Sequence, residues 1–310
     1  MSIRFHIPNF VNFYYPNLLL VKMIKEYPQY FIDGLEIGSV YGEFPPSLWN
    51  GGRSTAGMCT NKNDIKQILK SFNDLGVPCR FTYTNPMLEK KHLSDKHCNM
   101  CLALANNGLN EVIVFSDILE KYIRTNYPKY KLVSSTCKQI RDLDTLQAEL
   151  EKDYSLVVLD YNWNNKYEDL QKINRKDKCE VLVNPCCQPN CQRRGEHYQF
   201  IGKQQIDYVT HMNKYPNVPY KFQSFDCNFT ANSIFDVEKL STYVSQKDIL
   251  EKYVPMGFNN FKIEGRSFHL FNLIETYMQY MAKPEYRDEA RYTYILSLQQ
   301  NHVIEINSIV

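Results

Sequence analysis

The chain has 310 residues, with 36 Lys and Arg against 34 Asp and Glu, and its formal net charge is +2. A charge this close to neutral provides no electrostatic argument for a nucleic-acid partner, although it does not exclude a local basic patch. Hydrophobic residues make up 44% of the chain and aromatic residues 14%, which is enough for a sizeable core and excludes a compositionally disordered protein.

The sequence has no segment typical of export or membrane insertion. No apolar run approaches the ~20 residues that a membrane-spanning helix needs. The first residues lack the basic segment, apolar stretch and small residues of a secretory signal. We therefore expect a cytoplasmic protein without a membrane partner. In that reducing compartment, its ten cysteines are expected to bind metal more often than to form disulfides.

Short β-rich runs alternate with amphipathic stretches along the chain. The expected strands cover 3–7, 35–40, 79–84, 111–116, 131–135, 156–161, 180–184 and 260–265. The expected helices, with apolar residues at helical spacing, include 63–76, 117–127, 144–154 and 167–176. Eight strands alternating with helices is the count of an α/β fold of the (β/α)8, TIM-like barrel type. An open doubly wound sheet is the alternative.

Two long connections interrupt this alternation. The segment 42–57, rich in Gly and Pro, follows the second strand, and a cysteine-containing insertion at about 186–246 follows the seventh. Connections of this length inside a compact fold are usually functional. Since no repeat or linker is visible, we predict a single barrel domain over 1–310 with these two insertions.

The residues that follow the strands are the first candidates for chemistry, because the active sites of such barrels lie at the carboxyl ends of their strands. The candidates at these positions are Asn85, Ser116, Asp117, Ser135, Asp160, Asn162, Asn184, Glu264 and Arg266. The stretch NPCCQPNC, 184–191, falls at the same edge. We therefore expect it to belong to the site.

The cysteines of this stretch have the spacing of a metal-ligand pair. Cys187 and Cys191 are separated by three residues, which suits two thiolates on one iron or zinc centre, and a tetrahedral site needs two more ligands. Cys227 lies in the same insertion and is the natural third ligand. Cys98, after the third strand, is the predicted fourth ligand.

Other cysteines compete for the same role. Cys101 is close in sequence to the predicted fourth ligand, and Cys186 can replace its neighbour by a shift of one residue. Cys79 and Cys179 fall within predicted strands, where a cysteine is typically a small buried hydrophobic residue.

Several charged residues are candidates for substrate binding or catalysis. Arg266 offers a bidentate fork for a carboxylate, with Glu264 beside it, although a structural Glu–Arg pair would have the same pattern. Arg53 is adjacent to two glycines that allow a ligand to approach the backbone. Asp160 is a possible catalytic base or only the N-cap of a helix.

Arg194 and His197 lie one helical turn apart just beyond the cysteines. They are candidates for contact with a substrate or a cluster, and a solvent-facing helix end is the alternative. Asn184, at the end of the seventh strand, is a further candidate for substrate binding.

Two of these segments resemble the collagenase-like peptidase family, U-32. The eighth strand ends in KIEGR, 262–266, with Gly257 before it, and LVNPCCQPNCQRRGEH, 182–197, is similar to a family segment that contains Asn, two Cys, Arg and His at these positions. The segments 35–45, 49–53 and 121–136 also resemble parts of the family. The resemblance extends over most of the chain.

The resemblance implies a barrel-like fold and two kinds of activity. The family includes peptidases by name, and also oxygen-independent hydroxylases of ubiquinone synthesis and of RNA bases, which carry a four-cysteine [4Fe–4S] cluster with prephenate as the implied oxygen donor. Some members use a C-x6-C pair, a spacing that Cys179 and Cys186 also have, so the fourth ligand stays open.

We therefore predict an iron–sulfur protein that binds a [4Fe–4S] cluster through Cys98, Cys187, Cys191 and Cys227. Its expected function is oxygen-independent hydroxylation or redox modification of a small aromatic molecule or nucleobase. A peptidase is the first alternative, although H-E-x-x-H, G-x-S-x-G and P-loop motifs are absent from the sequence. A non-catalytic, cluster-binding partner of a homologous enzyme is the second.

Overall fold

Eight parallel strands close into one barrel, in the order in which they occur along the chain, with β8 paired to β1. The computed structural model describes residues 2–52, 58–229 and 231–305. The strands are β1 Ile3–Pro8, β2 Leu35–Gly42, β3 Cys79–Tyr83, β4 Glu111–Val114, β5 Lys131–Ser134, β6 Leu156–Val158, β7 Cys179–Leu182 and β8 Asn260–Lys262. The predicted (β/α)8 barrel is confirmed, and each strand overlaps its predicted range.

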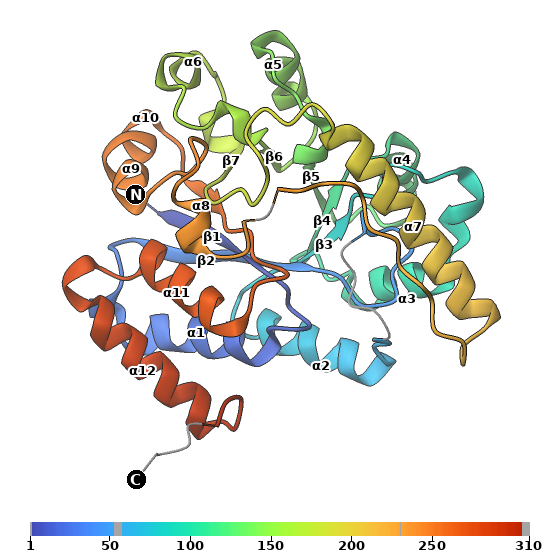
Figure 1. Ribbon diagram of the computed structural model, residues 1–310, viewed down its shortest axis with the longest axis horizontal. Coiled ribbons are helices and arrows are strands. Elements are labelled where there is room, and N and C mark those ends of the chain that lie inside the picture. The colour runs from blue at the N-terminus through green and yellow to red at the C-terminus, as the bar shows by residue number, and fades with distance from the viewer. Residues whose placement is uncertain (1, 53–57, 230, 306–310) are drawn as a thin grey trace.

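Helices surround the barrel on its outside (Figure 1). They are α1 Tyr14–Glu26, α2 Lys62–Asn73, α3 Lys96–Ala105, α4 Asp117–Asn126, α5 Leu143–Glu151, α6 Tyr167–Gln171, α7 Arg194–Lys214, α8 Ile234–Val237, α9 Gln246–Asp248, α10 Val254–Met256, α11 Leu270–Met281 and α12 Arg287–Gln300. The four predicted helices correspond to α2, α4, α5 and α6. In the described residues, no helix is long and apolar enough to span a membrane.

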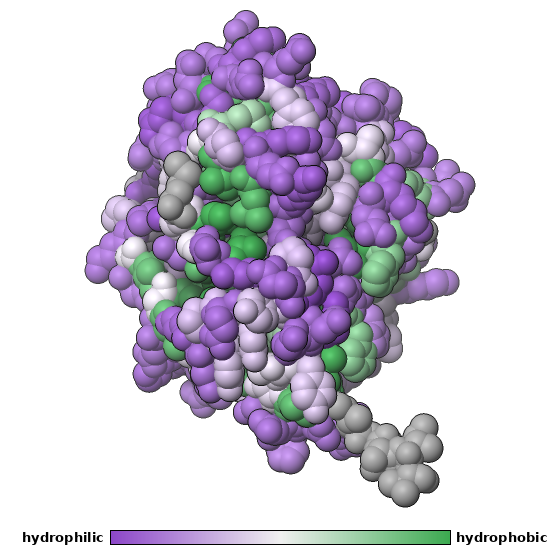
Figure 2. Space-filling model, turned by 90° about the vertical axis from the view of Figure 1, so that its left-hand side faces the viewer, coloured by the Kyte–Doolittle hydropathy of each residue, from purple (hydrophilic) through white to green (hydrophobic). Residues whose placement is uncertain are grey.

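The main hydrophobic core lies between the barrel and its helices. Strand residues of alternating position, such as Phe5 and Phe81, pack in one cluster with helix residues such as Leu20, Leu119 and Tyr277. This follows from the strand geometry, because successive side chains point to opposite faces. The face at the left of Figure 1 is largely hydrophilic, with hydrophobic residues confined to recessed bands (Figure 2).

The interior of the barrel is divided between an apolar side and a charged side. Ile113, Val133 and Val158, from β4, β5 and β6, form a small separate apolar cluster. On the other side, Arg80 from β3 and Glu180 from β7 are both fully buried. The charged half was not anticipated from the sequence.

Glu180 is the centre of this charged half. One of its carboxylate oxygens, Oε2, accepts a short hydrogen bond from the Arg80 guanidinium and lies 3.4 Å from His6 Nε2. Its other oxygen, Oε1, lies 3.5 Å from Lys262 Nζ. The Arg80 Nε donates to Glu111 Oε2 at 2.6 Å. Two carboxylates and two cations therefore balance one another where a single buried charge would be very costly.

The pKa values of these groups follow from burial and from their neighbours. Burial would raise the pKa of Glu180, but Arg80, His6 and Lys262 outweigh it and lower that pKa to about 2. Burial and the Arg80 charge lower the pKa of His6 to about 3. His6 is therefore neutral at physiological pH, and its ring nitrogens lie 2.8 Å from Ser39 Oγ and 3.3 Å from Asn260 Oδ1.

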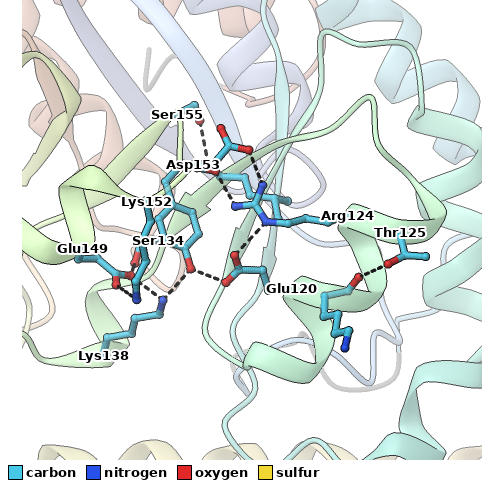
Figure 3. A network of polar contacts seen from close by, with 12 residues as sticks. Glu120, Arg124, Thr125, Ser134, Lys138, Glu149, Lys152, Asp153 and Ser155 are labelled. Carbon is cyan, nitrogen blue, oxygen red and sulfur yellow. Dashed lines mark hydrogen bonds and ion pairs between the residues drawn. The ribbon is translucent and has the colours of Figure 1, made fainter.

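A second polar network joins the outside of the barrel to α4 and α5 (Figure 3). Glu149 on α5 accepts hydrogen bonds from the Ser134 hydroxyl at the end of β5, at 2.5 Å, and from Lys138 and Lys152, both at 2.6 Å. Lys138 also donates to the hydroxyl of Tyr154 at 2.9 Å. Because the Tyr154 hydroxyl in turn donates to a carboxylate on α4, the network connects the two helices.

The insertion after β7 contains the long helix α7, which the sequence did not predict. This helix packs across the loops that follow β2 and β3: Gln205 Nε2 donates to Ser47 O at 2.8 Å, and Asn85 Nδ2 donates to Gly202 O at 3.0 Å. A Cβ at Gly202 would lie 2.7 Å from Asn85 Oδ1, and one at Gly52 would lie 2.5 Å from Ile201 O. Glycine at both positions therefore permits the close approach of this helix.

The chain then turns back and runs along α7 (Figure 1). Gln204 on the helix and Gln223 on the returning segment exchange two hydrogen bonds, at 2.8 and 3.1 Å. Phe225 of the returning segment stacks on His197, with ring centroids 4.5 Å apart. These contacts bring Cys227 back to the mouth of the barrel.

Removal of one partner from the buried charge cluster is expected to destabilise the protein strongly. Arg80→Met leaves Glu180 and Glu111 without their common cation, and breaking a buried pair costs about 3–5 kcal/mol. The matched control is Arg4→Met, which breaks the exposed Arg4–Glu36 pair, at a cost of about 0–1 kcal/mol. Urea unfolding measures both changes, and equal losses in the two variants would contradict the prediction.

Candidate active site

A cavity of about 260 Å³ opens at the carboxyl ends of the strands. Its walls come from the ends of β2 to β8, from the first turns of α7 and, after that helix, from Cys227, Phe229, Ala231 and Asn232. This is the edge at which TIM-barrel enzymes place their active sites. Seven predicted residues line it together: Ser135, Cys187, Arg194, His197, Cys227, Glu264 and Arg266.

The other predicted residues have different positions. Asp160 and Asn184 lie directly behind the cavity wall and support it, as described below. Cys191 is close enough to Cys187 to affect its titration. Cys98 lies elsewhere, and Arg53 is outside the residues that the structure describes.

Asn184 joins the ends of β7 and β8. Its side-chain amide donates to Glu264 O at 2.9 Å, and its Oδ1 accepts from Glu264 N at 2.7 Å. The Glu264 carboxylate in turn accepts a hydrogen bond from Cys186 N at 2.7 Å. Asn184 therefore positions the Glu264 backbone, and Glu264 positions the start of the cysteine loop.

Arg194 is a buried cation in the cavity wall. It is 1% exposed, its Nη2 donates to Asp160 Oδ2, and its Nε donates to Gln139 Oε1 at 3.3 Å. The guanidinium also lies 4.4 Å from the centroid of the Tyr161 ring. Its third nitrogen, Nη1, is buried and makes no hydrogen bond to any described residue. An unpartnered N–H group of this kind, in a cavity wall, is suited to an anionic ligand.

Asp160 pairs with two arginines, Arg194 and Arg141. Besides Arg194, its carboxylate lies 3.6 Å from Arg141 Nε and accepts from Asn162 N and Nδ2 at 2.9 and 2.7 Å. Asp160 is 2% exposed and is not part of the cavity wall. In this structure it therefore orients Arg194.

Arg266, after β8, supplies a second cation to the cavity. Its Nη1 donates to Thr82 Oγ1 at 3.2 Å, and its guanidinium lies 5.9 Å from the centroid of the Tyr41 ring. Tyr41 itself is held in place because its hydroxyl donates to Ile263 O at 2.6 Å.

Four thiols line the cavity: Cys137, Cys186, Cys187 and Cys227. Burial raises the pKa of Cys187, and the nearby Glu264 and Cys191 raise it further, against the effect of a hydrogen bond with Tyr161. All ten cysteines are free thiols. Thiols gathered from three segments provide the donor chemistry of an iron–sulfur or zinc site.

The predicted fourth ligand does not lie with this group. Cys98 is fully buried at the start of α3, with its sulfur 3.3 Å from Ser47 Oγ. Cys101 is buried on the same helix, and Cys179 begins β7 at the opposite end of the barrel, where its thiol donates to Arg175 O. Of the alternatives considered for this position, Cys186 lines the cavity. In the described residues, no three His, Cys, Asp or Glu side chains lie close enough together to hold a metal ion.

Lys262, Tyr41, Tyr161 and Cys137 line the cavity but were not among the predicted site residues. Lys262 could have been found, because residues two apart on a strand point to the same face and Glu264 was already a candidate. Cys137 directly follows the fifth strand and its candidate Ser135. The two tyrosines carry no comparable signal in the sequence.

Comparison with known proteins gives a structural match but no sequence match. No family model matches the sequence, and no curated protein matches it. The chain shares its fold with a U32 peptidase. The solved structure of the U32 peptidase Mk0906 superposes with a TM-score of 0.51 over 85% of this chain and 92% of that one, at 11% sequence identity.

The spore cortex-lytic enzyme SleL of Bacillus cereus superposes with a TM-score of 0.40, at 10% identity, over 86% of this chain and 72% of that one. At 11% sequence identity, the match to Mk0906 shows that the two chains share a fold. The function of this chain has to be argued from its site.

Loss of the Asn184 side chain is expected to loosen the junction of β7 and β8. Asn184→Ala removes the side chain that bonds to the part-buried N–H and C=O of Glu264, at a cost of about 1–3 kcal/mol. Asn174→Ala, which removes an exposed amide bonded to Gln147 at 3.2 Å, is expected to change stability by less than about 0.5 kcal/mol. Urea unfolding of both variants checks this, and a neutral Asn184→Ala would contradict the positioning role.

Proposed function

We propose that the chain is an enzyme related to the U-32 peptidase family that binds a small anionic molecule in the mouth of its barrel. The observation that carries this proposal is Arg194, a buried guanidinium with an unpartnered Nη1 in the cavity wall. Arg266 and Lys262 add positive charge to the same cavity. Cations with few water contacts favour a ligand that brings the opposite charge.

Aromatic side chains in the cavity wall support a planar or cyclic ligand body. Tyr41, Tyr161, Tyr198 and Phe229 all line the cavity. Aromatic walls with a few charged groups are typical of small-molecule sites. We infer that the substrate is a small aromatic molecule or a nucleobase, and that a carboxylate-bearing compound such as prephenate binds at the arginines.

We further propose that the cavity thiols hold an iron–sulfur cluster. Cys187, Cys191 and Cys227 are three of the four ligands expected from the sequence, and Cys186 is, among the alternatives to Cys98 that the sequence offered, the one that lines the same cavity. The donor set fits the cluster, while its assembly requires the loops that carry these cysteines to draw together. When bound, the cluster supplies the redox chemistry for an oxygen-independent hydroxylation.

The chain's own residues have definite roles in this scheme. Arg194, oriented by Asp160, binds a ligand carboxylate through Nη1, and Arg266 binds a second acidic group or a carbonyl oxygen. Glu264, fixed by Asn184, holds the Cys186 backbone. The segment that carries Cys227 and Phe225 contributes Cys227 to the cavity wall and packs Phe225 on His197.

Replacement of Arg194 tests the anion site. Arg194→Gln removes a charge-assisted hydrogen bond worth about 1.5–3 kcal/mol, so we expect prephenate, measured by titration calorimetry, to bind at least about 10-fold more weakly. The control is Arg193→Gln, since Arg193 is 52% exposed and points to Phe225. Arg266→Gln provides an independent variant that leaves the Asp160 pair intact. Prephenate binding that is unchanged in both cavity variants would refute the anion site.

Anaerobic purification tests the cluster. We expect a brown protein with broad absorption near ~400 nm and about four iron per chain, and we expect Cys187→Ser to lose this iron. Cys59→Ser is the control, because Cys59 is exposed and outside the cavity. A colourless protein with one zinc would contradict the cluster.

A peptidase is the second candidate, because the solved structure that shares this fold is named a U32 peptidase. Hydrolysis of peptides by iron-free protein, abolished by Arg194→Gln, would favour it. A cluster without turnover, together with stable co-purification of a homologous protein, would favour a non-catalytic partner.

A further inference from the structure

Lys262 is a buried lysine in the cavity wall. It is 8% exposed, and it lines the cavity together with Glu264 and Arg266. Its Nζ lies 4.2 Å from the centroid of the Tyr41 ring and 3.5 Å from Glu180 Oε1. The amine is thus held between an aromatic face and a carboxylate, at the boundary between the packed barrel interior and the open cavity.

The pairing of Lys262 with Glu180 is loose. Glu180 Oε2 already accepts the short hydrogen bond from Arg80 and faces His6. A separation of 3.5 Å between Nζ and Oε1 is beyond the usual length of an N–H···O hydrogen bond. Glu180 Oε2 is therefore satisfied by Arg80, whereas Oε1 makes no hydrogen bond to any described residue and faces Lys262 Nζ at 3.5 Å.

The surroundings favour the neutral amine. Burial lowers the pKa of Lys262 to about 8, with Arg80 and Arg266 acting in the same direction and Glu180 opposing them. The titratable or charged groups that face it are His6 on β1, Tyr41 on β2, Arg80 on β3, Glu180 on β7, and Glu264 and Arg266 after β8. A desolvated lysine beside other cations is the environment in which lysine acts as a nucleophile.

We propose that Lys262 is a nucleophilic amine that forms an imine with a carbonyl compound, specifically a 2-oxo acid, bound in the cavity. This inference rests on the proposed anion site, because a cavity arginine holds the carboxylate of the oxo acid while its carbonyl carbon faces Nζ. It assigns a covalent step to a residue that the proposed hydroxylation does not use.

The step needs no further reactant. The Nζ lone pair forms the C–N bond to the carbonyl carbon, the carbonyl π electrons move to oxygen, and a proton passes from Nζ to that oxygen to give a carbinolamine. The C–O bond then breaks, and the oxygen leaves as water after a second proton transfer. Glu264, in the same wall, can carry these protons, and ionised Glu180 stabilises the resulting iminium cation.

The product is an iminium whose nitrogen draws electrons from the neighbouring carbon. The C–H bonds on the carbon attached to the iminium carbon become acidic as a result. Bonds to that attached carbon can then be made or broken. A 2-oxo acid with an aromatic ring fits the tyrosines of the cavity, and phenylpyruvate is the simplest compound of this kind.

Reductive trapping tests the proposal on the metal-free chain of 310 residues. Incubation with pyruvate or phenylpyruvate and cyanoborohydride is expected to add one reduced oxo-acid group per chain, located at Lys262 by peptide mass mapping. The reaction should saturate with oxo acid and be lost in Lys262→Arg, which keeps the positive charge beside Glu180. Lys138 is an internal control, since it is also mostly buried but binds Glu149 outside the barrel.

The pH dependence separates a nucleophile from a structural lysine. Trapping at Lys262 should increase as the pH rises through about 8, because the amine loses its proton there, whereas surface lysines should increase only toward about pH 10.4. The absence of an adduct at Lys262 would overturn the inference. So would adducts spread equally over surface lysines in the unmodified protein and in Lys262→Arg. Prephenate binding that depends on Arg194 but is accompanied by no oxo-acid adduct would overturn the imine alone, and absence of both would overturn the anion site as well.

Discussion

The ionised Glu180 carboxylate in the middle of the barrel is the group on which the rest of the structure depends. It is fully buried and receives Arg80 on one oxygen and Lys262 near the other. Strands β3, β7 and β8 are thereby connected across the barrel axis, far apart in the sequence. Since an isolated buried charge is costly, the register that brings the three groups together is favoured over registers that would leave Glu180 unpaired. The apolar cluster of β4, β5 and β6 fills the other half by ordinary packing.

The same interaction influences the chemistry of the cavity above it. Glu180 holds Lys262 at the cavity floor, and the surrounding cations and the lack of water make that amine unusually easy to deprotonate. At the wall, Asp160 orients Arg194, whose buried Nη1 makes no hydrogen bond to any described residue. The charges inside the barrel therefore stabilise its interior and place cations at its mouth, where the proposed anionic ligand would bind.

The insertion after β7 completes the site from outside the barrel. Helix α7 supplies Arg194 and His197, and the returning segment brings Cys227 to the same cavity. Docking depends on close backbone approach at Gly52 and Gly202 and on the amide pair Gln204–Gln223. These contacts explain why one long connection can contribute both cations and thiols to a single cavity.

Local sequence patterns were sufficient for the barrel and for part of its site. The alternation of strands with helices predicted all eight strands, and the positions after β6 to β8 identified Asp160, Glu264 and Arg266. Strand exits in a parallel barrel meet at one edge, so this reasoning needs no knowledge of long-range contacts. The same reasoning missed α7, whose buried residues are dispersed among polar ones, and it placed Cys98 with a group of thiols from which the structure separates it.

The sequence by itself determined the number and order of the strands and the edge at which the candidate residues gather, because these depend on periodicity and chain direction. Only the tertiary structure decided which side chains share a cavity and what charge state they favour. The sequence offered both Cys98 and Cys186 as candidate ligands. In the structure, Cys98 is buried on α3 away from the cavity, whereas Cys186 follows β7 and lines the cavity. The lowered pKa of Lys262 depends on its burial and on the charges around it in the closed barrel, which brings Glu180 and Tyr41 to it. Desolvation and electrostatic interaction depend on distance in space and not on distance along the chain.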